Sequence, residues 1–465
     1  MPSRPAGPGR WGPVTSATRA PEAVAPWRRA DRPVLPGGTF EDPTRRGAAF
    51  AGVLVAAAGL ALYGSSATTA ASVLSLSVVS GLALPLWLVA LRPRRAALVG
   101  VALLALLVPL AVRTADLAAH PGPQESAHDG GVHVTRAGAE DLLAGRNPYA
   151  QPFADDLPPA WARINVVPGQ VTPNPVVDHL PYLPGAVLVA VPGVLLERAL
   201  GVGGDPRWVM GLFVLAAVVA LARRPEEAWA RAAAIVAFGS ASVVVYAAWG
   251  TNDAAAAALV VLAALGARRH PGWAGAALAL AVSYKAPLAL GLVPWAVWVV
   301  RRDGWAGLRP WGTAPALLAA TTLPFLAWSP GDLVTDTLRF WTGTTGTPFP
   351  ASGLGLGYRA PDLMESPLGP VVTVALAAAG LAGAVALARR VAHPAVLPVA
   401  SALVLLGLLV PARTFQPNYL GLLSGCLACG WLLAPGARLH DGAPAPVEMG
   451  RGPTSAGRHH PRRAG

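Results

Sequence analysis

The sequence predicts an all-α, polytopic membrane protein with about twelve transmembrane helices, because long apolar runs recur from Ala48 to Leu433. The composition supports this class, since 54% of the 465 residues are hydrophobic and only 13% are charged. Soluble domains carry about 25% charged residues. A third observation is that arginines occur in short clusters between the apolar runs, where the loops of a membrane protein lie.

The arginine clusters predict the topology, because cytoplasmic loops of membrane proteins collect basic residues. If every cluster is cytoplasmic, both termini are cytoplasmic as well. The net charge of +12 comes from these clusters and the two tails. No basic helix interleaved with aromatic residues suggests a nucleic-acid partner. The clusters are Arg45-Arg46, Arg92/Arg94/Arg95, Arg223-Arg224, Arg268-Arg269, Arg301-Arg302, Arg389-Arg390 and Arg462-Arg463.

Three segments follow from composition and charge. Segment 1–46 is rich in Pro, Arg and Gly and lacks an apolar signal core, which predicts a disordered cytoplasmic arm. Segment 47–434 is the integral membrane domain, and 435–465 is a second disordered cytoplasmic tail. The predicted spans, in order, are 47–64, 71–91, 96–112, 207–222, 230–248, 254–267, 271–284, 287–300, 311–327, 369–388, 394–411 and 418–434. Several are shorter than the usual ~20 residues.

Two long loops, 113–206 and 328–368, lie on the outer side in this topology. In the first loop, 134–143 predicts a short amphipathic helix that ends at Gly145. The apolar run 182–201 contains two prolines and follows a polar stretch, which favours a helix on the outer surface. The alternative is a true span, which would invert the topology on one side of it.

The stretch "LAVSYKAPLALG" contains Lys285, the chain's only lysine, at the outer end of span 271–284. Its ammonium could hold a phosphate, and snorkelling to lipid phosphates is the alternative. Asp129 and Asp253 are acids predicted at the same outer level. A carboxylate beside apolar walls can act as a base, whereas a loop or helix-capping role is the simpler interpretation of each.

One further outer turn carries polar and aromatic side chains suited to a sugar or a phosphate: Arg413, Gln416, Asn418 and Tyr419 in "RTFQPNYL". Interfacial anchoring by Arg and Tyr is the alternative. The chain's two cysteines, Cys426 and Cys429, lie inside an apolar span without a nearby Cys or His partner, so they are interpreted as small apolar residues. No metal-ligand cluster is predicted.

Five motifs in order are "LLAGRNPY", "DHLPYLPG", "WGTND", "GWAGAALALAVSYKAP" and "RTFQPNYL". Together with an acid after an early span, they resemble the GT-C class of integral membrane glycosyltransferases, and most closely the bacterial polyprenyl-phosphate-mannose-dependent mannosyltransferases. The resemblance covers roughly Leu98 to Leu433. It implies inverting transfer of a sugar, most often mannose, from a polyprenyl phosphate to an extracytoplasmic glycan, glycolipid or protein acceptor at the cell membrane.

The resemblance also implies roles for individual residues. Asp129 would be the base, with Asp116 and Asp178 as alternatives, and Lys285 with Arg413 would stabilise the leaving lipid phosphate. Asp253 would be a second outer acid that orients the acceptor or holds a divalent cation. The further substrate-binding candidates from the same motifs are Asn147, Tyr149, Tyr182, Gln416 and Tyr419.

A transporter or lipid flippase is the alternative function, and a non-enzymatic membrane scaffold is a third. Transporters often show repeated halves and polar groups near the membrane midplane. No clear internal repeat is found, and the distinctive charges are predicted on the outer face, which favours the enzyme.

Overall fold

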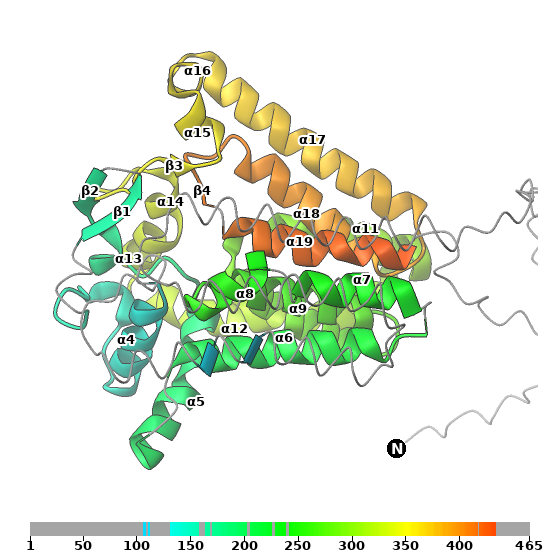
Figure 1. The fold of residues 1–465 in the computed structure, drawn as a ribbon, viewed down its shortest axis with the longest axis horizontal. Helices are drawn as coiled ribbons and strands as arrows, with labels where there is room; N and C mark the ends of the chain where they lie inside the picture. Colours follow the sequence, from blue (N-terminus) through cyan, green and yellow to red (C-terminus); the bar gives the residue numbers. More distant parts are fainter. Residues whose placement is uncertain are drawn as a thin grey trace, which may run out of the picture. The chain divides into compact units, whose positions relative to one another are not determined.

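Alanine, leucine and valine fill the apolar runs and proline or glycine stands near many of their ends, so the chain forms helices separated by short turns (Figure 1). The computed structural model describes residues 106–107, 110–111, 131–157, 163–167, 170–201, 205–225, 228–238, 241–416 and 418–433. All of them belong to one compact unit, Pro43–Gly465. The predicted arm and tail, the spans 47–64 and 71–91, most of span 96–112, and Asp116 and Asp129 lie outside the described residues.

Most described residues are helical, which confirms the all-α prediction. The α-helices are α4 Gly131–Leu143, α5 Pro184–Leu200, α6 Pro206–Ala222, α7 Ala228–Phe238, α8 Ala241–Ala248, α9 Asp253–Gly266, α10 Pro271–Tyr284, α11 Leu292–Asp303, α12 Thr313–Trp328, α13 Pro330–Val334, α14 Phe340–Thr342, α15 Leu356–Arg359, α16 Pro361–Glu365, α17 Leu368–Arg390, α18 Val396–Leu409 and α19 Tyr419–Ala428. Shorter helical turns are η1 Pro148–Ala150, η3 Pro175–Val177, η4 Ala286–Gly291, η5 Trp305–Gly312, η6 Thr335–Arg339 and η7 Cys429–Leu433.

The helices α6, α9 and α10 coincide with predicted spans to within one residue at each end. Three other predicted spans are each made of two helical pieces. Run 230–248 forms α7 and α8, run 287–300 forms η4 and α11, and run 418–434 forms α19 and η7.

Two short β-ladders were not predicted. Strands β1 (Arg163–Val167) and β2 (Gln170–Pro173) pair antiparallel within the first long loop. Strands β3 (Ser352–Gly353) and β4 (Thr414–Phe415) pair in parallel and join the second long loop to the turn before α19. This second ladder is a long-range contact, which no local hydrophobic period could indicate.

Among the described helices, α17 alone is long and apolar enough to cross a membrane by length and composition. It has 23 residues, and only 11% of its most apolar stretch is buried. An equally apolar helix in the core of a soluble protein would be mostly buried, so the exposure of α17 differs from that of a core helix. Helices α6, α9 and α18, together with Tyr419–Leu433, are apolar but shorter.

Small side chains hold the helices close together. The alanine run Ala254–Ala258 of α9 is fully buried, and α9 packs on α6, α10 and α19. Gly380 of α17 meets α18 so closely that a Cβ atom there would lie 2.6 Å from the Leu403 carbonyl oxygen. Gly407 meets Leu376 of α17 in the same way, at 2.6 Å.

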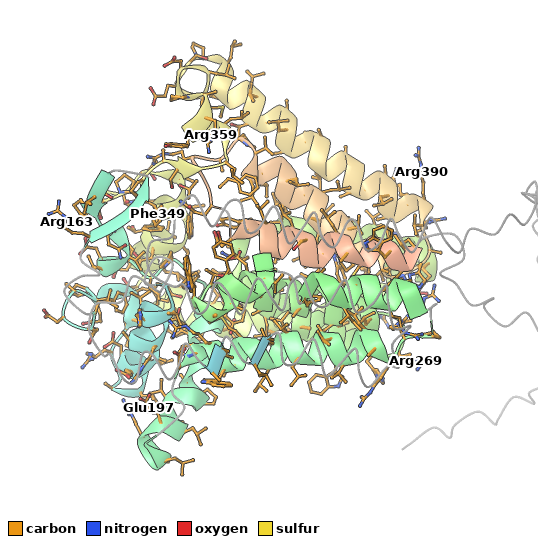
Figure 2. The ribbon with its side chains drawn as sticks, viewed as in Figure 1. Arg163, Glu197, Arg269, Phe349, Arg359 and Arg390 are labelled. Carbon is orange, nitrogen blue, oxygen red and sulfur yellow. The ribbon has the colours of Figure 1, made fainter. Side chains whose placement is uncertain are left out.

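Two arginine turns gather at one end of the helices. Arg268 Nη2, after α9, donates to the Ala392 carbonyl after α17 at 3.1 Å. Figure 2 shows Arg269 and Arg390 at this end and Phe349 at the opposite end. Helix α9 ends and α10 begins at the turn that contains Arg269, so the start of α9 and the end of α10 lie one helix length away from it. Helix α18 begins shortly after Ala392, which contacts Arg268, so the turn between α18 and α19 also lies one helix length away.

Helix α5, which corresponds to run 182–201, is buried in its first half and exposed in its second. Its N-terminal residues pack against α10 and α12, and a Cβ atom on Gly185 would lie 2.4 Å from Ser283 Oγ. The apolar residues Leu195, Leu196 and Leu200 at its C-terminal end are exposed. An apolar face that no described element covers is consistent with the expected surface helix.

Candidate functional site

A pocket of about 370 Å³, including its open mouth, lies at the ends of α9, α10 and α19 remote from the arginine turns. Elements far apart in the chain build it: the segment before α5, the turns at α9, α10 and α19, and the second long loop. Its lining combines one ammonium, three amides, two threonine hydroxyls and four aromatic rings. The lining residues are Tyr182, Thr251, Asn252, Lys285, Trp341, Phe349, Thr414, Gln416, Asn418 and Tyr419.

Lys285 stands where α10 ends. Its backbone N–H still donates to the Ala281 carbonyl at 2.9 Å, and its own φ and ψ are no longer helical. Pro287 follows two residues later and has no N–H to continue the α-helix. The side chain is therefore released from the helix end towards the pocket, and the residue is only 8% exposed.

Asp253 is the counter-ion of this lysine. Lys285 Nζ lies 3.0 Å from Asp253 Oδ1, and Asn418 Nδ2 donates to Asp253 Oδ2 at 2.5 Å. The ammonium also lies 4.3 Å from the centre of the Tyr419 ring. Burying an unpaired ion costs several kcal/mol, and the pairing with Asp253 offsets that cost. The carboxylate, the ammonium, the amide and the aromatic ring come from three separate segments and form one buried cluster.

The position of Asp253 changes the roles predicted for its segment. Asn252 precedes α9 but makes no side-chain cap, because its Nδ2 donates to the Tyr284 carbonyl at 3.1 Å. Both carboxylate oxygens of Asp253 are engaged by Lys285 and Asn418, so the geometry suits a residue that orients the lysine. Within the described ranges, no group of three or more His, Cys, Asp or Glu side chains is placed to bind a metal.

The turn 413–418 reaches the pocket with some of its predicted residues. Gln416 is buried, lines the pocket and hydrogen-bonds the Ser352 hydroxyl through Nε2. Arg413 is exposed and does not line the pocket, and its guanidinium instead lies against Gly343. Arg413 and Gln416 flank the two-residue strand β4, and residues three positions apart along an extended chain point to opposite faces.

Tyr182 lines the pocket, whereas Asn147 and Tyr149 support it from behind. Tyr149 Oη donates to the Tyr182 carbonyl at 2.7 Å, and its ring contacts Phe325 edge-on. Asn147 Oδ1 accepts from Tyr149 N at 3.1 Å and so caps η1. The structure therefore gives both predicted binding residues a structural contact in place of a position in the pocket wall.

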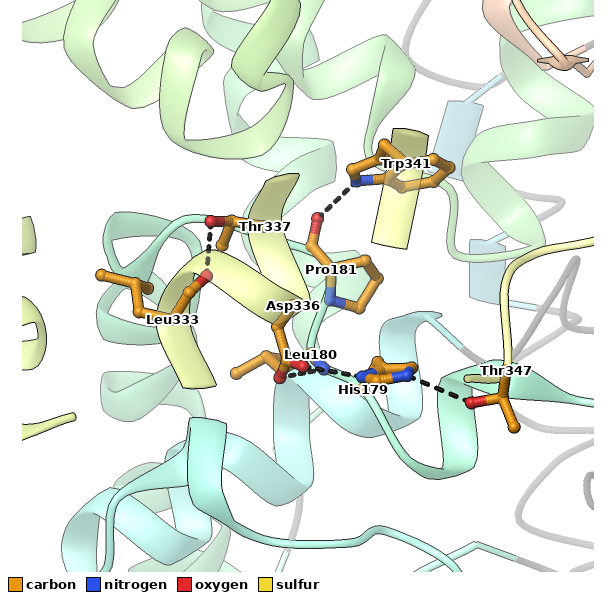
Figure 3. A network of polar contacts seen from close by, with 8 residues as sticks. All are labelled: His179, Leu180, Pro181, Leu333, Asp336, Thr337, Trp341 and Thr347. Carbon is orange, nitrogen blue, oxygen red and sulfur yellow. Dashed lines mark hydrogen bonds and ion pairs between the residues drawn. The ribbon is translucent and has the colours of Figure 1, made fainter. Parts of the chain in front are cut away.

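Every residue of the segment 179–183 makes a hydrogen bond to another element, which positions Tyr182. Figure 3 shows the bonds of His179, Leu180 and Pro181. His179 Nδ1 lies 2.7 Å from Asp336 Oδ1, and its Nε2 lies 3.2 Å from Thr347 Oγ1. Further bonds run from Leu180 N to Asp336 Oδ2 at 2.9 Å, from Trp341 Nε1 to the Pro181 carbonyl at 3.1 Å, and from Leu183 N to the Ser283 carbonyl at 3.3 Å.

Four residues of this region were missed in the sequence: His179, Asp336, Trp341 and Phe349. Burial raises the pKa of the Asp336 carboxyl above its usual value, while hydrogen bonds from His179 and Leu180 act in the opposite direction. The rings of Trp341 and Phe349 lie 6.2 Å apart and both line the pocket. The available signal was an acid and two aromatic rings within the second long loop, which is compatible with many other arrangements.

Two polar atoms of the pocket wall have no hydrogen-bond partner in the described part of the chain. These are Thr251 Oγ1 and Asn418 Oδ1, and both are buried. Buried polar groups are nearly always hydrogen-bonded, so unpartnered atoms in a pocket wall point to a ligand or solvent that completes them. Asn418 belongs to the turn that the sequence predicted to suit a sugar or a phosphate, whereas Thr251 was not predicted as a binding residue.

The acids predicted as a base are only partly placed. Asp178 is exposed at the end of η3 and does not line the pocket, while Asp129 and Asp116 lie outside the described residues. The described chain near Asp129 resumes at α4, whose Val132 packs on Gly250, one residue before Thr251 of the pocket. The helix that follows Asp129 in sequence therefore begins close to the pocket wall.

Comparison of this chain with protein-family models, with curated proteins and with solved structures finds no match. The chemistry of the pocket must therefore be inferred from its own side chains. They offer a cation with its counter-ion, flat aromatic surfaces, and amide and hydroxyl groups in a concave site. This combination suits a ligand that carries both negative charge and hydroxyl groups.

Proposed function

We propose that this protein is a GT-C-type membrane glycosyltransferase that transfers a sugar, a hexose such as mannose, from a polyprenyl phosphate to an extracytoplasmic glycan, glycolipid or protein. The observation that carries the proposal is the buried Lys285–Asp253 pair, whose lysine lines the pocket. The chain's only lysine lies where a single cation could meet a phosphate. Around it lie the amides and aromatic rings that a sugar requires.

The lysine has a specific task in this reaction. When the bond between the sugar and the phosphate breaks, negative charge grows on the departing polyprenyl phosphate. A cation already oriented in a water-poor site stabilises that charge without reorganising. Asp253 and the Tyr419 ring hold the ammonium of Lys285 in place, at 3.0 Å and 4.3 Å. Asp253 is then a positioning residue.

The acceptor hydroxyl needs a base as it attacks the anomeric carbon. Asp129 is the residue proposed for this step, on the sequence resemblance and on its place just before α4. The acceptor proton would pass to the Asp129 carboxylate as the new glycosidic bond forms. An attack opposite to the departing phosphate inverts the anomeric configuration.

The apolar surface supports a membrane location for this chemistry. Helix α17 is apolar and largely exposed, and Leu323, Leu326 and Trp328 of α12 are exposed as well. Exposed apolar surface of this kind is costly in water and is normal in lipid. A lipid-linked donor would reach the pocket from such a surrounding, with its phosphate at the level of Lys285.

The test uses the full-length protein in lipid nanodiscs with radiolabelled mannosyl polyprenyl phosphate and envelope acceptor. We expect Lys285→Met to lower transfer by about 100-fold or more, as when one charge-stabilising donor is removed from an active site. Lys285→Arg should recover part of the activity. The matched control is Arg302→Met, because Arg302 is an exposed cation paired with its neighbour Asp303 in the last turn of α11.

Asp129→Asn should fold, insert and lose transfer in the same assay. Folding of each variant is checked by its thermal unfolding midpoint, because Lys285→Met leaves a buried carboxylate unpaired. Full transfer by a folded Lys285→Met protein would reject the assigned phosphate site. Movement of the donor lipid across vesicles without any sugar transfer would favour the flippase alternative.

A further inference from the structure

We infer that Asn418 is a specificity-determining residue whose side-chain carbonyl oxygen accepts a hydrogen bond from a hydroxyl group of the bound sugar. The inference rests on the proposed function, because it takes the ligand to be a sugar phosphate. It gives one defined role to a residue of the turn that the sequence predicted only in general terms to suit a sugar or a phosphate. The contacts of the Asn418 amide, its burial and the charge of its neighbour carry the argument.

The neighbour Asp253 determines the orientation of the Asn418 amide. An ionised carboxylate only accepts hydrogen bonds, whereas an amide has a donating nitrogen and an accepting oxygen. Asn418 Nδ2 therefore faces Asp253 Oδ2, at 2.5 Å. The reverse orientation would bring two oxygens together, and Asp253 itself is held by Lys285 at 3.0 Å.

Because Asn418 Nδ2 donates to Asp253, the carbonyl oxygen Oδ1 of the same amide points away from this carboxylate. Asn418 is 5% exposed and lines the pocket, and Oδ1 has no donor among the residues that the structure describes. Thr251 Oγ1, in the same pocket wall, is also buried without a partner there. A buried acceptor without a donor is costly, so a pocket ligand that supplies a hydrogen gains affinity from it.

Lys285 and Asn418 suit two different parts of a ligand, because the first donates hydrogen bonds and the second has an accepting oxygen. Phosphate oxygens accept hydrogen bonds, so they suit the Lys285 ammonium and are repelled by the Asn418 carbonyl oxygen. A sugar hydroxyl donates, so it suits Asn418 Oδ1, and the Thr251 hydroxyl can either donate or accept. A hydroxylated ring attached to a phosphate satisfies both parts at once, whereas a lipid phosphate without a sugar satisfies one.

The experiment measures equilibrium binding of water-soluble, short-chain prenyl phosphates to the full-length protein in detergent. The series comprises the prenyl phosphate alone, its mannosyl ester, and mannosyl esters that each lack one hydroxyl group. We expect one of the deoxy compounds to bind at least about tenfold more weakly than the parent, because a buried acceptor loses its donor. Compounds lacking other hydroxyls should bind within about threefold of the parent.

The variant Asn418→Leu removes the acceptor and should remove this discrimination, so that the parent and the selected deoxy compound bind alike. Asn418→Gln keeps the amide and should restore part of the preference, which a purely structural role would not produce. Asn174→Ser is the matched control. Asn174 is another buried asparagine, but it accepts from Val176 N at 3.1 Å and does not line the pocket.

Three outcomes would overturn the inference. The first is a folded Asn418→Leu protein that still discriminates against the same deoxy compound. The second, which needs only the wild type, is a deoxy series whose members all bind within about threefold of the parent. The third is wild-type protein that binds the mannosyl ester no more tightly than the prenyl phosphate. This result would reject the sugar contact of Asn418 but not the phosphate site at Lys285. Failure to bind any prenyl phosphate rejects the proposed function itself.

Discussion

Gly250 shows how a single residue allows the pocket wall to form. It precedes Thr251, and its φ of +82° lies in the region that favours glycine. A Cβ atom there would lie 2.7 Å from Val132 Cγ1 and 2.9 Å from Arg207 Nε. The backbone of the turn before α9 therefore packs directly on α4 and α6, which no larger residue would permit.

Gly250→Ala should destabilise the protein by about 2–4 kcal/mol, because overpacking adds to backbone strain. The measurement is the thermal unfolding midpoint of purified protein in detergent. Gly201→Ala is the control, since Gly201 has a φ of +69° but nothing within 4 Å of an added Cβ atom. It should cost only about 1–2 kcal/mol of backbone strain. Equal losses in the two variants would contradict the close packing at Gly250.

At the scale of elements, the segment 179–183 connects the first long loop to the second. Asp336, Trp341 and Thr347 of the second loop bond to His179, Leu180 and Pro181. The aromatic wall of the pocket is consequently a product of two loops that hold each other. Either loop alone would leave backbone groups of the segment without partners.

The Asp336 carboxyl should make this contact sensitive to pH. Its pKa is raised in the folded protein, so the folded state binds the proton more tightly than the unfolded state, whose pKa is about 3.9. The extra free energy of unfolding that comes from this proton is fully present below the pKa of the unfolded state. It is lost as the pH rises through the raised pKa of the folded state. Unfolding midpoints of wild type should therefore fall, relative to Asp336→Asn, as pH increases from about 4.

The control for this experiment is Asp178→Asn, which changes an exposed carboxyl beside the same segment. Its unfolding midpoints should follow those of wild type across the pH range. Parallel curves for wild type and Asp336→Asn would show that the buried carboxyl does not titrate differently in the folded and unfolded states.

At the scale of the whole molecule, the arginine turns and the pocket mark different ends of the helices. Arg269 and Arg390 lie at one end, and Phe349 of the pocket lies at the other (Figure 2). Under the proposed function, the membrane separates these ends and the arginine-rich side faces the cytoplasm.

Cysteine labelling tests this arrangement directly. Gly346→Cys, in the exposed loop beside the pocket, should react with a membrane-impermeant maleimide in intact cells. Arg269→Cys, in the exposed turn after α9, should react only after the cells are permeabilised. The native cysteines Cys426 and Cys429 are buried, so background labelling of the folded protein should be low. Labelling of Arg269→Cys from outside would reject the topology.

Much of the helical architecture could be predicted from the sequence, because helix formation depends on neighbouring residues. Apolar runs with proline or glycine near their ends located α6, α9 and α10 to within one residue at each end. Run 418–434 was recognised as helical but not as two pieces, since small changes from α to tighter turns leave little trace in composition. The β3–β4 ladder was missed because its partners are distant in sequence.

The sequence by itself determined that the chain is helical and apolar, and that Lys285 is its only lysine. The tertiary structure alone decided that Lys285 pairs with Asp253, that Asn418 binds the same carboxylate, and that Arg413 lies outside the pocket. The physical reason is that helices form from contacts within one turn, whereas a pocket forms from side chains brought together by packing. A buried charge finds its counter-ion only after the helices around it have closed.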